Sequence, residues 1–578
     1  MFNASTLPVS KTSRAWTPGR ISWVWRISVL ALLFIGAQVE VGPFQLAVYY
    51  LIQDRWTILL AVVLMMGVAA LAQRGCGAGL LDRLAASERL PLLMLALAVL
   101  AAFAGTHLIF GATPVSYDEV QADFDARVFA AGKLAYPVPE AWRPFIAALG
   151  PLFFLRIPDG AAWISAYWPG NAALRALFDS TIGMAWCSPA LLGVGLASTY
   201  GVARKLWPDR RDAAFIAVLL LGTSSQALVT AMTPYAMTAH LAVNMLWLRL
   251  FLQDRPLAHA GAMAVGVLGV GLHQVVFHPL FVAPFILMLL CQKRVRLAAF
   301  YMAGYGVALA AWSLYPVWLA WLQTPGAGPS DPIRALLVDR WADGAGQGRF
   351  GHGVAFGLTV LNLARLAAWL NPALILLFAV GAPLALAKGA LPRAILASVL
   401  LTAAAATLAL PYQGHGWGWR YSHGVLGSMA LVGAMAWLNL TERPDRGEWS
   451  SIVAGASLGS LLLLFPLNAL HAARFAAPIR DALALIQGAG TDLVVVDGDA
   501  VSFGEDLARN RPDLRNTPKI LSLEKIPPAA LPELCRRGSI AVFDAGAATR
   551  LGFIGANGPE PRSPMREAFD AQCKARIL

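Results

Sequence analysis

Residues 114–127, PVSYDEVQADFDAR, hold four acidic side chains directly after an apolar run that is long enough to cross a bilayer. The acids are Asp118, Glu119, Asp123 and Asp125. A carboxylate beside low-dielectric lipid has its pKa raised toward neutral pH, which suits it to accept a proton from a hydroxyl group. This stretch therefore predicts a general base, with Asp118 as the first candidate and Glu119 beside it.

A purely structural role competes with the catalytic one. Ser116 and Glu119 have the spacing of a capping box, in which each side chain bonds the other residue's backbone at the start of a helix. Acids in a first helical turn also interact favourably with the helix dipole. The cap does not explain all four acids, since carboxylates at this density repel one another unless cations or a ligand compensate them. Arg127 and Lys133 are near enough in the sequence to do so.

The composition is that of a multi-spanning membrane protein. The 578 residues are 58% hydrophobic and 13% charged, with a mean hydropathy of +0.60, which a soluble domain could not bury. A net charge of +12 is explained by Lys and Arg in cytoplasmic loops, and no basic-aromatic patch indicates a nucleic-acid partner. Cys535 and Cys573 in the tail can form a disulfide if the tail lies outside.

Apolar stretches predict about thirteen transmembrane helices. They are 22–40, 57–73, 91–112, 183–202, 213–231, 236–252, 258–272, 275–291, 297–321, 370–387, 393–410, 424–440 and 451–468. Clusters of Lys and Arg fall between alternate helices, so the positive-inside rule places the N-terminus in the cytoplasm and everything after residue 470 outside. Five outer segments hold most of the unusual polar residues: loop 113–182, the turn before His240, the turn 273–278, loop 322–355 and loop 411–424.

The pattern divides the chain into three parts. Residues 1–90 form a cytoplasmic tail with two additional helices, residues 91–470 form the main transmembrane module, and residues 471–578 form a small outer α/β domain. In this tail TDLVVVDGD, PKILSL and SIAVFDAG predict strands, whereas AVSFGEDLARN and PAALPELCRRG predict helices. Neither a P-loop nor a dinucleotide-binding glycine motif is present, so the tail shows no sign of nucleotide binding.

Three motifs resemble those of a known superfamily. DEVQADFDARVFAAGKLAYP resembles the first outer loop of the GT-C glycosyltransferases, which include protein O-mannosyltransferases and the lipid A aminoarabinose transferase. AYWPGNAALRAL resembles their Tyr-Pro-Pro-Gly segment, with Trp168 in place of the first proline, and GWGWRYSHG resembles their aromatic-Gly-x-Arg-Tyr stretch. The resemblance covers residues 91–440 in architecture. It departs in one respect: the acidic loop follows the third predicted helix, whereas in those relatives it usually follows the first.

The resemblance implies a GT-C-like fold and a defined activity. Such enzymes take a sugar from a polyprenyl phosphate and transfer it to a hydroxyl group on the outer face of the membrane. For this chain it implies a multi-pass protein of the bacterial inner membrane with a periplasmic C-terminal domain, acting on a lipid, glycan or protein acceptor. Asp118 would be the base, with Glu119 supporting it or binding the acceptor. No cofactor is required, although a divalent cation near these two carboxylates stays an alternative.

A lipid phosphate leaving group needs cations arranged around its developing negative charge. Arg420, which stands between two aromatic residues, is the leading candidate, and its alternative role is that of an interfacial arginine reaching toward headgroups. The further candidates for the donor phosphate are His415, His423, Arg127 and Lys133. The candidates for a substrate cavity are His240, His273, Tyr421 and Tyr167, and for the histidines a hydrogen-bonded core position is the alternative. The spacing of His273 and His278 does not predict a metal site.

Two other functions remain open at this stage. A polysaccharide ligase or polymerase with lipid-diphosphate donors would depend on outer Arg and His residues rather than on the Asp-Glu pair. A lipid-linked-sugar flippase or transporter would show broken helices and charges at mid-membrane.

Overall fold

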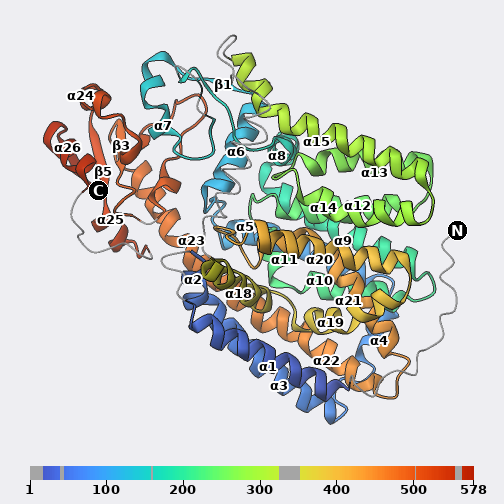
Figure 1. Cartoon of the computed structure of the whole chain (residues 1–578). Coiled ribbons are helices and arrows are strands. Elements are labelled where there is room, and N and C mark those ends of the chain that lie inside the picture. The colour runs from blue at the N-terminus through green and yellow to red at the C-terminus, as the bar shows by residue number, and fades with distance from the viewer. Residues whose placement is uncertain are drawn as a thin grey trace.

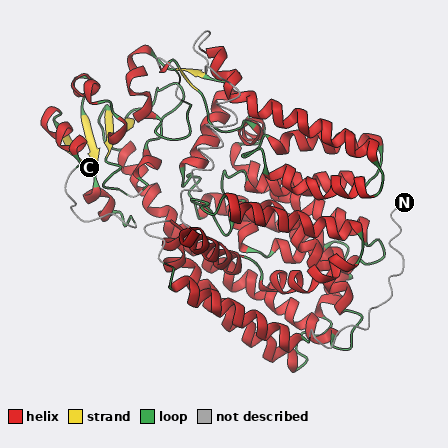
Figure 2. Ribbon diagram, viewed as in Figure 1, coloured by secondary structure: helices red, strands yellow, loops and turns green. Residues whose placement is uncertain are grey.

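The structure is a computed structural model, and it describes residues 17–39, 45–155, 157, 160–323, 352–501, 503–553 and 563–578. Figure 1 shows a large bundle of helices with a smaller lobe, which holds the C-terminus, at one end. The bundle is helical, and the strands lie in the lobe and the loops next to it (Figure 2). The expected fold class, a helical membrane protein with a small C-terminal α/β domain, is confirmed.

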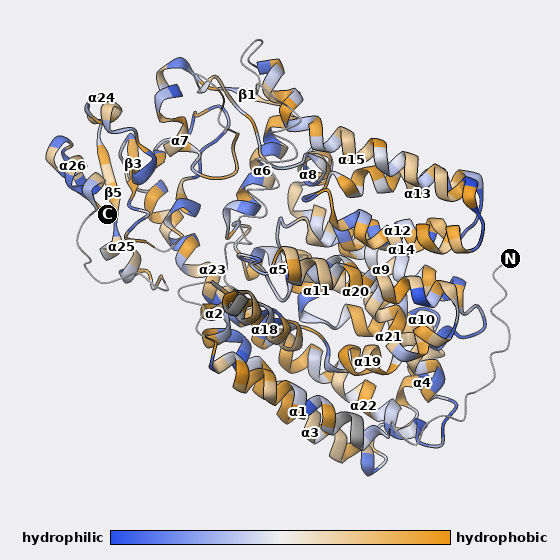
Figure 3. Cartoon of the chain, in the orientation of Figure 1, coloured by the Kyte–Doolittle hydropathy of each residue, from blue (hydrophilic) through white to orange (hydrophobic). Residues whose placement is uncertain are grey.

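The apolar stretches form helices because a helix bonds its own backbone groups where no water is available. Large apolar side chains stay exposed on the outer helices, as lipid contact requires, and apolar residues follow the helices in Figure 3. The longer helices are α1 (Pro18–Ala37), α3 (Arg55–Gln73), α5 (Leu90–Leu108), α9 (Cys187–Leu206), α10 (Arg211–Gly222), α12 (Met237–Phe251), α13 (Pro256–Val270), α14 (Phe277–Cys291), α15 (Val295–Gln323), α18 (His352–Trp369), α19 (Pro372–Ala387), α20 (Ala390–Ala409), α21 (Leu426–Leu440), α22 (Arg446–Gly459) and α23 (Phe465–Gln487).

The predicted number of about thirteen spans is not confirmed. By length and hydropathy, six of the described helices can cross a membrane, or seven when one bent pair counts as a single span. The predicted span 213–231 is broken between α10 and α11 (Ser225–Thr230). At the break, the hydroxyl groups of Thr223 and Ser224 donate to the carbonyls of Leu219 and Leu220, which competes with continued helix.

One helix of the bent pair was not predicted. It is α18, which meets α19 at an angle of 115°. Two of its polar side chains, Asn362 and Arg365, interrupt the apolar pattern. Both are buried against the backbone of loop 411–420, so they belong to the interior of the protein.

The basic loops of the bundle share one end, as predicted. Arg446 forms an ion pair with Asp82 of α4 (Leu80–Ala85) at 2.5 Å, and Arg211 pairs with Glu88. Arg294 likewise pairs with Asp254, which follows α12, at 2.5 Å. Lys11 and Arg14 lie outside the described residues.

Four of the five predicted outer segments meet at the opposite end. They include α6 (Tyr117–Ala130) and α8 (Gly170–Asp179) from loop 113–182. The amide of Gly170 donates to the carbonyl of Gly271 at 2.8 Å, and the hydroxyl groups of Ser116 and Tyr235 are 2.7 Å apart. Most of loop 322–355 lies outside the described residues.

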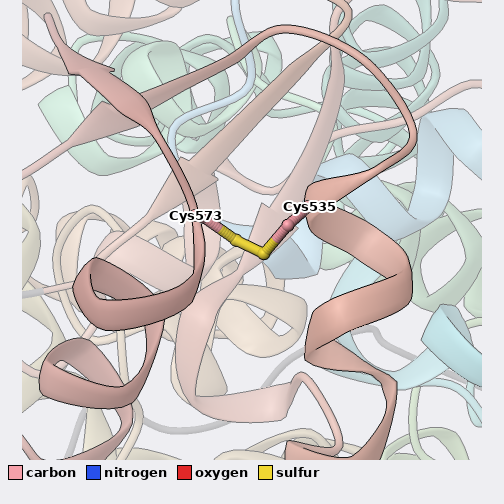
Figure 4. Close-up of a disulfide and its surroundings, with 2 residues drawn as sticks. All are labelled: Cys535 and Cys573. Carbon is pink, nitrogen blue, oxygen red and sulfur yellow. A yellow bond between two sulfur atoms is a disulfide. The ribbon is translucent and has the colours of Figure 1, made fainter.

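The lobe contains a parallel sheet with the strand order β4-β3-β5-β6. Its strands are β3 (Leu493–Val496), β4 (Lys519–Ser522), β5 (Ile540–Phe543) and β6 (Ala575–Ile577), and its helices are α24 (Leu531–Cys535), α25 (Ala545–Arg550) and α26 (Pro564–Gln572). The three predicted strands are confirmed; β6 was missed because it is short and largely exposed. Cys535 and Cys573 form a disulfide that joins α24 to the end of α26 (Figure 4).

The helix predicted for AVSFGEDLARN is wrong. The segment contains a single 3₁₀ turn, Gly504–Leu507, in an otherwise irregular loop. Its polar side chains bond to neighbouring elements instead of lining one face of a helix. Asn510, for example, binds the backbone of β4 through both its amide group and its carbonyl oxygen.

The lobe and the outer loop share one hydrophobic core. Phe145 and Leu149, at the ends of α7 (Ile146–Leu149), belong to the same buried cluster as Leu521 of β4. A second short strand pair, β1 (Tyr136–Pro137) with β2 (Ala162–Trp163), fixes the loop around α7. The boundaries at 90/91 and 470/471 stay predictions, and α23 runs across the second of them.

Candidate active site

The predicted capping box forms at the start of α6. Ser116 is the N-cap, and the Oε2 atom of Glu119 accepts hydrogen bonds from the amides of Val115 at 2.7 Å and Ser116 at 3.0 Å. The Oε1 atom of Glu119 is buried and has no hydrogen-bond partner among the described residues. The cap therefore uses one oxygen of Glu119 and leaves the other available.

Asp118 and Arg420 form a buried ion pair although 302 positions separate them. Nη1 of Arg420 lies 2.7 Å from Oδ2 of Asp118, with side-chain exposures of 6% and 14%. The hydroxyl group of Tyr167 donates to Oδ1. The Tyr167 ring also packs edge-on to His273, whose ring centroid is 5.3 Å away. Two predicted cavity residues thus lie beside the predicted base and the predicted phosphate ligand.

The expected rise in the pKa of Asp118 is wrong. Burial alone would raise it, but the Arg420 charge, His273 and the Tyr167 hydrogen bond together hold the pKa below its usual value. The neighbouring carboxylate, Glu119, has a raised pKa instead. Burial raises the pKa of Glu119 to about 7, against the opposing effect of its two backbone hydrogen bonds. Burial also lowers the pKa of His273 to about 4, so this imidazole is neutral at pH 7.

The glycines of loop 411–420 allow Arg420 to reach this place. The Oε1 atom of Gln413 accepts from the amide of Arg420 at 2.8 Å, and Arg365 donates to the carbonyls of Gly416 and Gly418. Gly418 has φ +70°, and a Cβ there would lie 2.4 Å from Oε1 of Gln226. Glycine suits this position, because it adopts the backbone angle without strain and leaves room for the Gln226 side chain.

A small cavity of ≈ 20 Å³ lies on one side of Arg420. Its lining includes His240, Tyr421, Phe277 and Asn244. Among the described residues, neither ring nitrogen of His240 nor Nε of Arg420 has a hydrogen-bond partner. A space of this size holds about one water molecule, so a phosphoryl group would require the lining to open.

His423 is fully buried one turn after Arg420, and its two ring nitrogens have no hydrogen-bond partner among the described residues. His278 is also fully buried, but Asn244 and Tyr305 bind its ring at 2.7 and 2.8 Å. The core role considered for the histidines therefore applies to His278.

A larger cavity of ≈ 270 Å³ lies against Glu119 and Asp123 of α6. It is lined further by the end of α5, the start of α9 and the turn at 232–234. Arg175 from α8 binds Asp123 at 2.6 Å and also faces this space. The cavity combines carboxylates with a guanidinium group, which suits a ligand with several hydroxyl groups.

The compensating cations are not the predicted ones. Arg127 and Lys133 are exposed; Arg127 lines the larger cavity, and the Lys133 ammonium lies 4.2 Å from the centre of the Tyr136 ring. Two of the four acids, Asp118 and Asp123, are paired instead with Arg420 and Arg175. Arg175 lies in AYWPGNAALRAL, so the motif was noticed but its arginine was not.

Both ring nitrogens of His415, another predicted phosphate ligand, are near protein groups. Nδ1 lies 2.9 Å from the hydroxyl group of Tyr49, and Nε2 lies 3.4 Å from Oδ2 of Asp506. Sequence reasoning missed both Asp506 and Tyr235, although Asp506 lies in AVSFGEDLARN and Tyr235 lies in the predicted outer turn before His240. In the described part of the chain no group of three or more His, Cys, Asp or Glu residues is placed to hold a metal ion. The divalent cation stays an untested alternative.

Fold and site together describe a multi-spanning membrane protein with a buried acid–arginine pair where its loops and its C-terminal lobe meet.

No protein-family model and no curated protein matches the chain. Among solved structures, it is similar to ArnT from Cupriavidus metallidurans bound to undecaprenyl phosphate, with 12% identity, a TM-score of 0.49 and coverage of 73% of this chain and 85% of that one. For the apo state of the same protein the TM-score is 0.47, with 12% identity over 73% and 84% of the chains. The apo oligosaccharyltransferase of Archaeoglobus fulgidus gives a TM-score of 0.45, with 11% identity over 75% and 65%.

Proposed function

We propose that this protein is a membrane glycosyltransferase that moves a sugar from a polyprenyl phosphate to an acceptor hydroxyl group. The observation that supports it most is the buried Asp118–Arg420 pair. Arg420 lines the smaller cavity, and Glu119, the neighbour of Asp118, lines the larger one. A base for the acceptor and a cation for the leaving phosphate are the two groups that this reaction needs. We place the protein in the bacterial inner membrane, with the N-terminus in the cytoplasm and the lobe in the periplasm. Its disulfide is in keeping with an oxidising compartment.

In the proposed reaction the acceptor hydroxyl group gives its proton to Asp118. The hydroxyl oxygen bonds to the anomeric carbon of the sugar. The bond between that carbon and the phosphate oxygen breaks, and its electron pair stays on the phosphate. The products are the glycosylated acceptor and polyprenyl phosphate, whose negative charge Arg420 stabilises.

The Asp118–Arg420 ion pair gives donor binding a second effect. Arg420 lowers the pKa of Asp118, and a carboxylate with a low pKa is a weak base. A donor phosphate that binds Arg420 weakens the ion pair between Arg420 and Asp118. The pKa of Asp118 then rises, so this carboxylate is a stronger base when a donor is present. The buried donors around Arg420, including His240 and His273, supply further contacts for the phosphate.

The acceptor is assigned to the larger cavity. Its carboxylates and Arg175 provide hydrogen-bond acceptors and donors for hydroxyl groups, and the free Oε1 atom of Glu119 is one of them. In this assignment Glu119 binds the acceptor while Asp118 takes the proton. The two neighbouring carboxylates then have different roles because their surroundings give them different pKa values.

The test follows donor consumption by purified protein in liposomes. Radiolabelled polyprenyl-phosphate sugars are supplied with cell-envelope extract as acceptor, and release of polyprenyl phosphate is measured. We expect release by wild type and a loss of about 10²-fold or more for Asp118→Asn. Asp125→Asn is the matched control. Asp125 is a buried carboxylate on the same helix, but its side chain is hydrogen-bonded to Gln121 and Ser165 and not to an arginine. Equal loss in both variants, or no donor use by wild type, contradicts the proposal.

One observation favours a second candidate, a lipid-linked-sugar transporter. The bent pair α18–α19 is a broken helix of the kind that transporters use. Close to it, Arg365 and Asp54 lie 3.8 Å apart with no exposed surface. A transporter would move the labelled lipid between leaflets without releasing polyprenyl phosphate. It would respond to Asp54→Asn and not to Asp118→Asn.

A further inference from the structure

The C-terminal lobe reaches the start of the acidic helix α6 through one carboxylate. Oδ1 of Asp506 accepts a hydrogen bond from the amide of Tyr117 at 2.8 Å. Tyr117 is the first residue of α6 and stands directly before Asp118. A carboxylate at this position satisfies an amide that has no partner within the helix and interacts favourably with the helix dipole.

The same carboxylate also faces the other half of the catalytic pair. Its Oδ2 atom lies 3.4 Å from Nε2 of His415. The carbonyl oxygen of His415 accepts from Nη1 of Arg420 at 2.7 Å, and the same Nη1 binds Asp118. Asp506 therefore contacts, on one side, the backbone that presents Asp118. On the other side it contacts the residue whose carbonyl group holds Arg420.

A second residue of the lobe fixes the loop before α6. Nη1 of Arg509 donates to the carbonyl of Pro114 at 2.7 Å, and its Nε donates to the carbonyl of Asp506 at 2.6 Å. The contact between Asp506 and His415 is buried, since Asp506 is 6% exposed and His415 is 7% exposed. Figure 1 shows the lobe beside α6 and α7, where the shared core lies.

We propose that Asp506 is a positioning residue which the C-terminal lobe contributes to the transferase site. It holds Asp118 and Arg420 at the separation that the reaction requires. This inference rests on the proposed function. The lobe then completes the active site, and its docking on α6 sets the rate of the chemical step.

Removal of this carboxylate is expected to lower kcat more than it changes the KM for the donor. Arg420 is still present to bind phosphate, but the base is less well placed, and a displacement of about 1 Å can cost about 10²-fold in rate. We expect kcat to fall about 10²-fold in Asp506→Ala. Asp506→Asn keeps an oxygen for the Tyr117 amide but has no charge for His415, so we expect a smaller fall of about 10-fold.

Asp497→Asn is the matched control. Asp497 is in the same lobe and is equally buried at 6%, but it pairs with Arg566 at 3.2 Å and not with α6. Its kcat is expected to stay within about threefold of wild type. Resistance of the lobe to limited proteolysis reports whether the lobe is folded in each variant.

His415→Asn tests the second contact from the membrane side. It leaves the lobe unchanged and removes the ring that faces Asp506, so kcat should fall while the lobe stays resistant to limited proteolysis. This variant keeps the proposal testable if the Asp506 variants do not fold. A kcat for Asp506→Ala and His415→Asn equal to that of Asp497→Asn overturns the proposal.

Hydrogen exchange separates this proposal from the proposed function. If wild type releases no polyprenyl phosphate, the proposed function fails, but the contact can still be measured at the Tyr117 amide. Faster exchange there in Asp506→Ala than in Asp497→Asn supports the positioning contact. Equal exchange in the two variants overturns it independently of any activity.

Discussion

At the scale of single residues, two adjacent carboxylates differ because their neighbours differ. Asp118 faces Arg420 and Tyr167, whereas Glu119 is buried with one oxygen in the helix cap and the other unbonded among the described residues. The sequence predicted both residues and the capping box, since these depend on spacing within one turn. It could not predict which pKa rises, because the cation that decides it comes from a position 302 residues away.

The raised pKa of Glu119 makes stability depend on pH. Between its ordinary value of 4.5 and its folded value of about 7, the folded protein binds more protons than the unfolded chain. The contribution of Glu119 to stability is therefore largest at acidic pH and falls as the pH rises through this window, by an amount on the order of 3 kcal/mol. We expect Glu119→Gln to make this part of the profile less steep and to raise the Tm above pH 7; Asp125, whose pKa burial also raises to about 7, keeps part of the slope. Thermal unfolding in detergent from pH 4.5 to pH 8 measures it. A wild-type Tm that rises across the window, with Glu119→Gln unchanged, contradicts this assignment.

Arg420 should control affinity for the lipid phosphate. Arg420→Gln removes the buried cation and leaves Asp118 without its partner. We expect polyprenyl phosphate to bind at least about 30-fold more weakly, which corresponds to about 2 kcal/mol. Equilibrium binding to protein in nanodiscs measures the change. Lys133→Gln is the control, since Lys133 is exposed and lies on the Tyr136 ring. A larger effect of the control than of Arg420→Gln would show that the phosphate binds elsewhere.

At the scale of elements, the helices were easier to predict than their breaks. Long apolar runs and the capping box predicted α5 and α6 in nearly the observed place. The break before α11 was missed because Thr223 and Ser224 stand in a largely apolar run. The bent helix α18 was missed because its buried polar side chains look in the sequence like loop residues. The irregular segment around Asp506 was predicted as a helix for a related reason: its partners come from distant elements.

The glycine at 418 should be essential to the loop that holds Arg420. Gly418→Ala introduces a Cβ at φ +70° that meets Gln226, so we expect a loss of stability of about 1–3 kcal/mol and a fall in activity. Gly132→Ala is the matched control, with φ +71° but no atom within 4 Å of the added Cβ. The two variants share the cost of the backbone angle and differ in the contact. Unfolding midpoints and initial rates measure both effects, and equal behaviour of the two variants would contradict the role of this contact.

At the scale of the whole molecule, the catalytic helix is held between the bundle and the lobe. Sequence patterns predicted the lobe as an α/β domain with three of its four strands, because buried strands form short apolar runs. They could not show that the lobe shares a core with loop 113–182, since Phe145 and Leu521 meet only in the folded protein. The number of transmembrane helices could not be predicted from the sequence either, because short apolar helices in the interior have the same composition as membrane-crossing ones.

The disulfide should therefore affect activity as well as stability. It closes a loop over a sequence separation of 38 residues, and its loss is expected to destabilise the lobe by about 2–4 kcal/mol. Cys535→Ser with Cys573→Ser should lower the midpoint of unfolding of the lobe. The transfer rate should fall with it, because a lobe that undocks removes Asp506 from α6. Limited proteolysis and initial rates in the same samples test the link, and full activity with an unfolded lobe would contradict it.

The central claim is that Asp118 takes the proton of the acceptor while Arg420 holds the phosphate. A single-turnover experiment tests it most directly: wild type and Asp118→Asn are loaded with labelled donor, mixed with acceptor, and followed by formation of glycosylated product. We predict equal or tighter donor binding by Asp118→Asn, because the phosphate no longer competes with a carboxylate for Arg420, and a transfer step slower by about 10²-fold or more. A transfer step at the wild-type rate would contradict the claim and leave the acids of α6 as helix caps and ion-pair partners.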